Sequence, residues 1–176
     1  MKQKGFTLIE LLVVISIIGL LASVVLVALN SSRSKGRDAK RVADVHQISI
    51  ALEEYIQDNP SGLYPQAGGS GVFDSRPFVA SPNDWNTFKN YLVPIYMSKL
   101  PTPPLNGKGY GSMCSNCDEY RYVANPSGTA FSICTYLENS APVGTQNVIG
   151  SNIFGPFYCV SNGCDPFTSL TSGTCN

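Results

Sequence analysis

The chain begins with a few polar residues and then becomes apolar for the length of a membrane-spanning helix. Residues 11–29 are nineteen uncharged, mostly apolar positions without proline. At a rise of about 1.5 Å per residue this run spans roughly 28 Å, close to the hydrocarbon thickness of a bilayer. Glu10 interrupts the apolar character at the start of the run. The pattern predicts a single membrane helix with a carboxylate near its N-terminus, where an acid also offsets the helix dipole.

The apolar period then changes to that of an amphipathic helix, from about residue 35 to residue 57. Val45, Ile48 and Leu52 recur at the spacing that lines one helix face. We expect the opposite face to carry the polar residues Asp38, Lys40, Arg41, Asp44, Gln47, Glu54 and Gln57. The helix should continue the membrane segment as one rod, with residues 30–32 as a weak point, and should end at the turn-forming residues 59–62. The only histidine, His46, lies near the edge of the stripe and is expected to be partly packed.

A second, short helix is predicted before residue 94. Ser81 suits the N-cap and Pro82 the first helical position, which makes Asp84 the third residue and a capping acid rather than a catalytic one. Pro94 would end this helix, because proline cannot continue the backbone hydrogen bonding.

Strand patterns follow in the second half of the chain. Residues 120–124 and 130–137 are rich in strand-forming side chains, and residues 125–128 offer a turn with proline second and glycine fourth. A helix laid across such a hairpin buries both apolar faces. The predicted fold class is therefore α+β, with a long N-terminal helix, half membrane-spanning and half amphipathic, packed on a small antiparallel sheet. Beyond residue 140 the chain is loop-like, with short strand candidates at 147–149, 153–154 and 157–160.

All six cysteines lie in the last third of the chain: Cys114, Cys117, Cys134, Cys159, Cys164 and Cys175. An even number outside the apolar segment predicts structural disulfides in a cysteine-rich C-terminal tail. Six cysteines allow fifteen full pairings, and the sequence leaves the pairing open. Zinc and redox interpretations of the first two cysteines also stay open, although zinc needs a second ligand pair and a redox pair should open a helix.

Composition and charge exclude several classes of function. Twelve basic and twelve acidic residues give a net charge of zero, so the sequence predicts no specific nucleic-acid partner. His46 stands alone on the long helix, and no paired carboxylates lie in a recognisable frame. We therefore expect no catalytic residues, no metal site and no enzyme. A membrane-anchored binding module that stays monomeric remains an alternative.

Residues 5–14, Gly-Phe-Thr-Leu-Ile-Glu-Leu-Leu-Val-Val, resemble the N-terminal signature of type IV pilins and pseudopilins. The resemblance is strict over about the first thirty residues and looser in the order of the later elements. It implies that a prepilin peptidase cuts after Gly5 and that the new terminus, Phe6, is N-methylated. It also implies that Glu10 pairs with the Phe6 amine of a neighbouring subunit during assembly. A secretory signal would instead need a small-residue cleavage site after the apolar run, and residues 30–32 offer none.

The resemblance implies a domain order and a structural function. Residues 1–5 would be the leader, 6–29 the transmembrane and assembly helix, 30–58 its amphipathic continuation and 59–176 a globular head. The chain would be a subunit of a type IV pilus-like filament, inserted as a prepilin and assembled through its N-terminal helix. A pseudopilin of a type II secretion or DNA-uptake machine is the alternative. Segments 63–65 and 98–101 are similar in spacing to pseudopilin-type major subunits, although Thr102 replaces the usual aspartate.

The same resemblance implies partners and a location. The partners would be identical or related pilin subunits, the inner membrane, the prepilin peptidase and the assembly machinery. The chain would cross the cytoplasmic membrane once before assembly and lie in an extracellular or cell-envelope filament afterwards. No cofactor is expected. Some relatives bind calcium in C-terminal loops, and calcium stays open here, although Asp118, Glu119 and Asp165 are scattered along the sequence.

Charge flanks the apolar run on both sides. Lys2 and Lys4 precede it, and five cations follow it at Arg33, Lys35, Arg37, Lys40 and Arg41. The positive-inside rule alone would favour the opposite orientation. Processing by the peptidase requires a cytoplasmic N-terminus, so we take that orientation. We interpret the cations after the run as a solvated or headgroup-contacting helix face.

Overall fold

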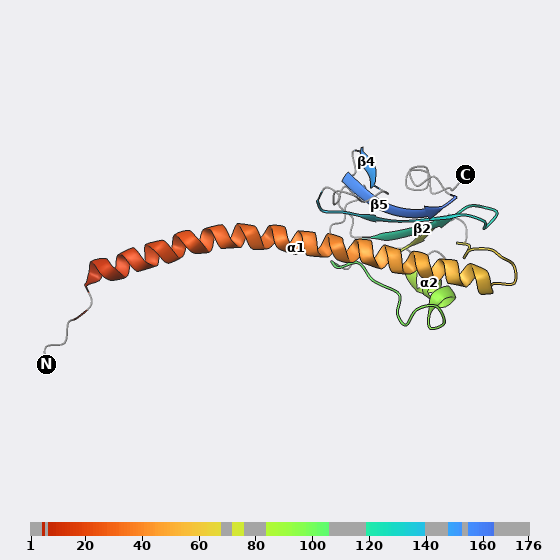
Figure 1. Ribbon diagram of the computed structural model, residues 1–176, viewed down its shortest axis with the longest axis horizontal. Helices are drawn as coiled ribbons and strands as arrows, with labels where there is room; N and C mark the ends of the chain where they lie inside the picture. Colours follow the sequence, from red (N-terminus) through yellow and green to blue (C-terminus); the bar gives the residue numbers. More distant parts are fainter. Residues whose placement is uncertain are drawn as a thin grey trace. The chain divides into compact units, whose positions relative to one another are not determined.

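The structure, a computed structural model, describes residues 5, 7–67, 72–75, 84–105, 119–139, 148–152 and 155–163. The chain divides into two compact units, Met1–Gly36 and Arg37–Asn176. Helix α1 (Leu8–Asp58) contributes to both units (Figure 1). The elements after it are β1 (Val72–Asp74), α2 (Trp85–Leu92), β2 (Tyr120–Ala124), β3 (Phe131–Tyr136), β4 (Val148–Asn152) and β5 (Gly155–Asn162).

The prediction of one continuous helix is confirmed, since α1 has no break at the expected weak point. There the hydroxyl of Ser32 donates to the carbonyl of Ala28 at 2.9 Å, which satisfies the side chain within the helix. In the second unit Val45, Ile48 and Leu52 are fully buried, so the apolar stripe was predicted correctly. His46 is exposed, and the expectation that it is partly packed was wrong.

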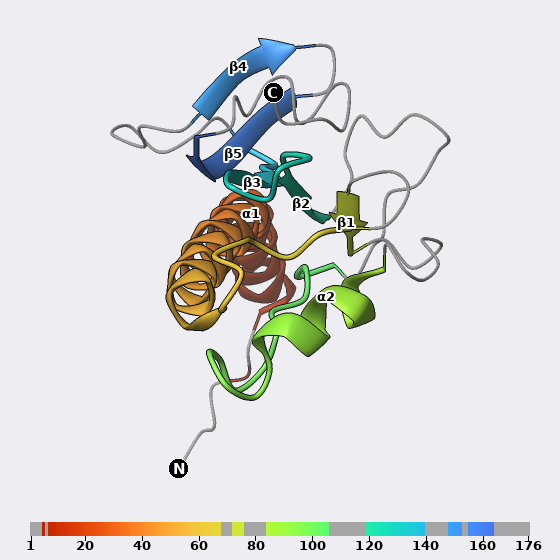
Figure 2. The same cartoon turned by 90° about the vertical axis from the view of Figure 1, so that its right-hand side faces the viewer.

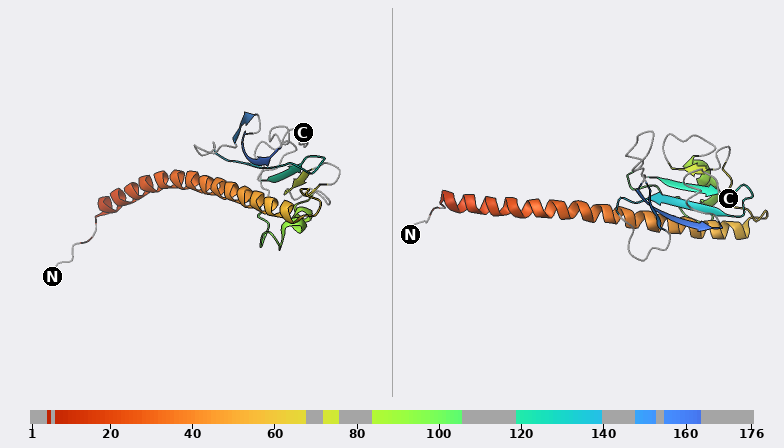
Figure 3. Two further views of the ribbon diagram at one scale, coloured as in Figure 1. Left: turned by 45° about the vertical axis from the view of Figure 1, so that its right-hand side comes forward. Right: turned by 90° about the horizontal axis from the view of Figure 1, so that it is seen from above.

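Five strands form one sheet in the order β1-β2-β3-β5-β4, and every neighbouring pair is antiparallel. Within the second unit, α1 and α2 pack on the same face of this sheet (Figure 2). The right-hand view of Figure 3 shows the strands over the C-terminal part of α1. The α+β class predicted from sequence is therefore confirmed.

The predicted hairpin is present with nearly the expected limits. β2 and β3 pair from Tyr120 opposite Thr135 to Ala124 opposite Phe131. Gly128 closes the turn with φ 71°, a left-handed conformation that favours glycine. A side chain there would also crowd Leu63, because the added Cβ would lie 3.1 Å from the Leu63 Cβ.

The C-terminal region is more regular than its sequence suggests. The candidates at 147–149 and 157–160 correspond to longer strands, Val148–Asn152 and Gly155–Asn162, which complete one side of the sheet. The candidate at 153–154 lies outside the described residues. Pairing of β5 with β3, and of β4 with β5, explains the difference, because a weak strand is ordered when it extends an existing ladder.

The start of the second helix was predicted wrongly. Asp84, not Ser81, is the N-cap of α2, and its carboxylate accepts the backbone N–H of Thr87 at 3.1 Å. Asp84 is therefore a capping acid as expected, but it precedes the helix. Its backbone also bridges Asp74 at the end of β1, which keeps this residue extended. Ser81 lies outside the described residues.

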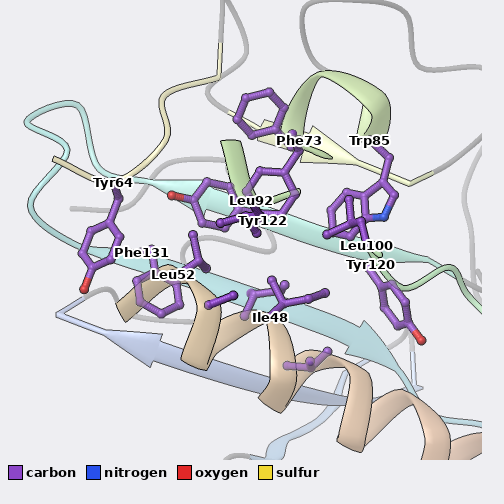
Figure 4. Packing of buried hydrophobic residues seen from close by; sticks show 14 of the residues in the cluster. Ile48, Leu52, Tyr64, Phe73, Trp85, Leu92, Leu100, Tyr120, Tyr122 and Phe131 are labelled. Carbon is purple, nitrogen blue, oxygen red and sulfur yellow. The ribbon is translucent and has the colours of Figure 1, made fainter. Parts of the chain in front are cut away.

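The core lies between the two helices and the sheet and is rich in aromatic rings (Figure 4). Phe88 of α2 stacks on Tyr122 of β2 with ring centroids 4.6 Å apart, and Phe73 of β1 lies 5.2 Å from Phe88. Trp85 packs 4.9 Å from Phe88 and donates its indole N–H to the Pro101 carbonyl. Strand β1 was missed from sequence because three residues are too few to show a strand period.

Strand β3 is buried on both faces. Phe131 and Ile133 contribute to the helix-facing core, while Ser132 and Cys134 on the other face are also buried. Cys134 lies opposite Cys159 of β5, and the two form a disulfide. The crosslink therefore joins the hairpin to the C-terminal strands.

The helix–sheet core generates the first prediction. Replacing the fully buried Ile48 with alanine should lower the free energy of unfolding by about 3 kcal/mol, because it leaves a cavity. Ile50, on the same helix and 48% exposed, is the matched control, and its alanine variant should lose about 0.5 kcal/mol or less. Denaturant unfolding of the full chain in detergent, followed by Trp85 fluorescence, measures both. Equal losses would contradict this packing of the helix on the sheet.

Candidate assembly site

The start of α1 is closed by a reciprocal capping box. Oε2 of Glu10 accepts the backbone N–H of Thr7 at 2.8 Å and its hydroxyl at 2.6 Å. In return the backbone N–H of Glu10 points to the Thr7 hydroxyl at 3.4 Å. A Thr-x-x-Glu pair of this kind satisfies the unpaired N–H groups of a helix start. Sequence reasoning attributed a dipole effect to Glu10 but missed this spacing.

The two oxygens of Glu10 are used unequally. Both Thr7 donors bind Oε2, and within the described residues no hydrogen bond reaches Oε1. One oxygen therefore holds the local turn while the other can accept a further donor. Gly5 is exposed, and a Cβ placed there would meet no atom within 4 Å. Phe6, the other predicted processing and assembly residue, lies outside the described residues.

The first unit carries an exposed apolar surface. The large apolar side chains that the structure describes between Leu8 and Leu29 are between 43% and 82% exposed. Within the described ranges α1 is the one helix long and apolar enough to cross a membrane. Such a surface requires lipid or other apolar helices around it.

Small and hydroxyl residues interrupt that surface without leaving polar groups unsatisfied. Ser16 and Ser23 donate to the carbonyls of Leu12 and Leu20 at 2.8 and 2.7 Å. A Cβ added at Gly19 would meet nothing within 4 Å. Gly19 and Ser23, four residues apart, therefore form a small-residue site where another helix can approach closely.

In the second unit, three residues of the predicted polar face of α1 are buried against the head: Asp38, Arg41 and Asp44. The other predicted members, Lys40, Gln47, Glu54 and Gln57, are exposed as expected. Arg41 is 1% exposed and lies 2.7 Å from Asp38 and 2.8 Å from Glu138. Asp38 also accepts the backbone N–H groups of Glu138 and Asn139, each at 2.9 Å. Arg37 adds a two-point ion pair to Glu138. Pairing explains the burial, because an unpaired charge there would cost several kcal/mol.

A second polar contact follows one turn later on α1. Asp44 is buried and accepts the hydroxyl of Tyr120 from β2 and the ammonium of Lys40. Lys40 also donates to the Thr102 carbonyl at 3.1 Å. Asp44 and Lys40 thus attach α1 to the sheet and to the segment after α2.

A third contact lies near the C-terminal end of α1. Tyr64 donates its hydroxyl to Glu53 at 3.1 Å, and the amide of Asn162 at the end of β5 donates to the other Glu53 oxygen at 3.0 Å. Burial, together with the nearby Glu53 charge, raises the pKa of Tyr64 to about 12. The tyrosine therefore stays protonated and remains a donor over the physiological range.

Comparison with known proteins identifies a family motif and several relatives by sequence. Residues 1–26 match a family model described as the prokaryotic N-terminal methylation motif. The chain is 37% identical over 103 residues to type II secretion system core protein G of Escherichia coli strain K12, an alignment that covers 58% of this chain and 67% of that protein.

The chain belongs to the type IV pilin and pseudopilin family.

Further relatives carry the same description. Core protein G of Pectobacterium carotovorum is 35% identical over 103 residues, covering 58% of this chain and 62% of that protein. Core protein G of Vibrio cholerae is 35% identical over 104 residues, covering 58% and 66%. The matched region thus spans about two thirds of these relatives. No solved structure matches the chain.

The structure describes only some of the other candidate residues in this member of the pilin family. Cys134 and Cys159 are joined, while Cys114, Cys117, Cys164 and Cys175 lie outside the described residues. Of the acids considered for calcium, Asp118 and Asp165 also lie outside them, and Glu119 is buried beside β2. The expectation of no cofactor, with calcium as the open alternative, therefore stays a prediction.

The ion pairs of Glu138 generate the second prediction. Hydrogen bonds from Arg37, and further contact with Arg41, hold the pKa of Glu138 below its ordinary value of 4.5. A lowered folded-state pKa stabilises the fold above about pH 4.5, and that stabilisation is lost as the pH falls through the folded-state pKa. Glu138→Gln should cost about 2 kcal/mol at pH 7, because it weakens contacts to a buried arginine.

Denaturant unfolding of the full chain from pH 7 to pH 3 measures this contribution. The wild type should lose stability more steeply below pH 4.5 than the Glu138→Gln variant. Glu54→Gln removes an exposed acid from α1, the helix that carries the two arginine partners of Glu138, and serves as the control. Identical pH profiles for wild type and Glu138→Gln would show that Glu138 does not contribute in this way.

Proposed function

We propose that this chain is a pseudopilin of a type II secretion machine, trimmed after Gly5 and assembled through α1 into a filament. The observation that carries the proposal is the similarity to several proteins named type II secretion system core protein G, at 31–37% identity. It favours the secretion alternative over the type IV pilus filament that the sequence first suggested. The N-terminal methylation motif supports the same processing in either case.

Assembly follows from the surface of the first unit. In the bilayer the apolar residues of α1 contact lipid, and in a filament they would contact the α1 helices of neighbours. Exchanging lipid for apolar helix gains little by the hydrophobic effect, so close packing and specific polar contacts must decide the arrangement. Gly19 and Ser23 provide the close approach. Repeated head-to-tail contacts that do not close into a ring then produce a filament.

Glu10 supplies the specific polar contact in this proposal. Cleavage after Gly5 creates a cationic amine at Phe6, and the Glu10 oxygen left free by Thr7 can accept such an amine from a neighbour. The pairing would offset the cost of an acid within apolar surroundings. A wrong register would leave the acid unpaired and would be disfavoured. The same side chain thus caps its own helix and selects the position of the next one.

The Glu10→Gln variant distinguishes the capping role of residue 10 from the role of its charge. A glutamine oxygen can still complete a capping box but carries no charge. We predict that Glu10→Gln and Glu10→Ala both reduce filament yield at least tenfold, because each removes the partner of the neighbouring amine. Thr7→Val, which removes the capping hydroxyl and keeps the acid, should retain most of the yield.

Filament sheared from cells, normalised to membrane-inserted subunit, measures the outcome. The mass of the N-terminal peptide shows whether each variant is still processed to a methylated Phe6. Full yield from Glu10→Gln with lost yield from Thr7→Val would assign Glu10 a capping role alone.

Deletion of the chain tests the choice of machine. A pseudopilin of type II secretion predicts that exported proteins accumulate inside the envelope while surface pili remain. Complementation with the wild-type chain should restore secretion, and complementation with Glu10→Ala should not. Lost pili with normal secretion would support the pilus filament and overturn the secretion proposal.

A further inference from the structure

The five cations that follow the apolar segment have different roles in the structure. Three of them attach α1 to the head or to its own turn: Arg37 and Arg41 bind Glu138, and Lys40 binds Asp44. These three cannot serve an outside partner without giving up a contact of the fold.

The other two, Arg33 and Lys35, are exposed, and no ion-pair partner for either occurs within the described residues. The sequence has no acid between Glu10 and Asp38. Asp38 lies three residues after Lys35, but its oxygens already accept Arg41 and two backbone N–H groups. Both cations therefore face outward with their charge uncompensated by the described part of the chain.

Their height along α1 matches the headgroup layer of a bilayer. The apolar run ends at Leu29, so the backbone of Arg33 lies about 6 Å beyond it and that of Lys35 about 9 Å beyond it. Headgroups occupy roughly 5–8 Å on each side of the hydrocarbon core. Lysine and arginine side chains reach several ångströms along such an interface. Two cations without an ion-pair partner among the described residues thus lie at the depth of the lipid phosphates.

We propose that Arg33 and Lys35 bind the phosphates of anionic phospholipids on the membrane face nearest the head. This inference rests on the proposed membrane insertion of α1. The two residues are about 200° apart around the helix, so they contact separate lipids on opposite sides. Together they set the depth of the subunit, and Arg37 begins the head contacts on the next turn. Of the five cations that follow the apolar segment, two would thus bind lipid and the other three make contacts within the fold.

Titration of the purified full chain with phosphatidylglycerol in detergent tests the proposal. Native mass spectrometry counts the bound lipids and gives their affinity. Each cation near an anionic surface strengthens binding about fivefold, and each contacts its own lipid, so R33Q/K35Q should bind each of these lipids about fivefold more weakly than wild type. Wild type should prefer phosphatidylglycerol over zwitterionic phosphatidylethanolamine, and the variant should lose this preference.

Two matched variants complete the test. K89Q/K99Q removes two exposed cations from the head and should bind lipid like wild type. R33K/K35R exchanges the two cations, keeps both charges and should also bind like wild type. Equal affinity of wild type and R33Q/K35Q would overturn the proposal, as would an equal loss in K89Q/K99Q. A lower yield of sheared filament from R33Q/K35Q, with unchanged lipid affinity, would overturn the proposal and assign the two cations to an acidic protein partner instead.

Failure of the underlying membrane insertion gives a different result. Resistance of the wild-type chain to carbonate extraction from membranes measures insertion independently of lipid affinity. An extractable wild type would overturn the membrane anchor and with it the proposed function. A resistant wild type with no preference for phosphatidylglycerol would overturn only the role of Arg33 and Lys35.

Discussion

The position of α1 on the sheet of the second unit depends on the ion pairs that its buried charged residues form. Its apolar stripe could pack on any sheet of suitable width, but Arg41 and Asp38 are buried only because Glu138 and its neighbouring backbone meet them. These partners are about one hundred residues apart in sequence, so the helix and the end of β3 must be placed together. A shift of one turn would leave an arginine and an acid buried without partners. Packing holds the helix on the sheet, and the ion pairs decide its position.

Local patterns in the sequence predicted the helices and strands that are determined by residues close together in the chain. The apolar run, the stripe through Ile48 and the hairpin of β2 and β3 each follow from residue spacing. The predicted polar face of α1 was wrong only for Asp38, Arg41 and Asp44, because their burial depends on residues far along the chain. Strand β1 has too few residues for a pattern, and β5 is ordered by β3. Asp84 displaced Ser81 as the cap because its backbone is already held by β1.

The features of the candidate site also separate into those with a local sequence signature and those that depend on the fold. The Thr7–Glu10 capping box has a sequence signature and could have been found from it. The pairing of Cys134 with Cys159 could not, because it follows from the register between β3 and β5. The division of the basic cluster into attached and outward-facing cations also needed the fold. From their spacing in the sequence, Arg33 and Arg41 look alike. The fold distinguishes them, because Arg33 is exposed and Arg41 is buried and paired with Asp38.

The separated polar contacts along α1 have a mechanical consequence. Asp38 is tied to the end of β3, and Glu53 is tied through Asn162 to the end of β5. These anchors lie fifteen residues apart, about 22 Å along the helix. A pull along α1 would therefore load both anchors and the core between them at once, in shear, instead of opening contacts one after another. The head is built to carry axial force as a unit.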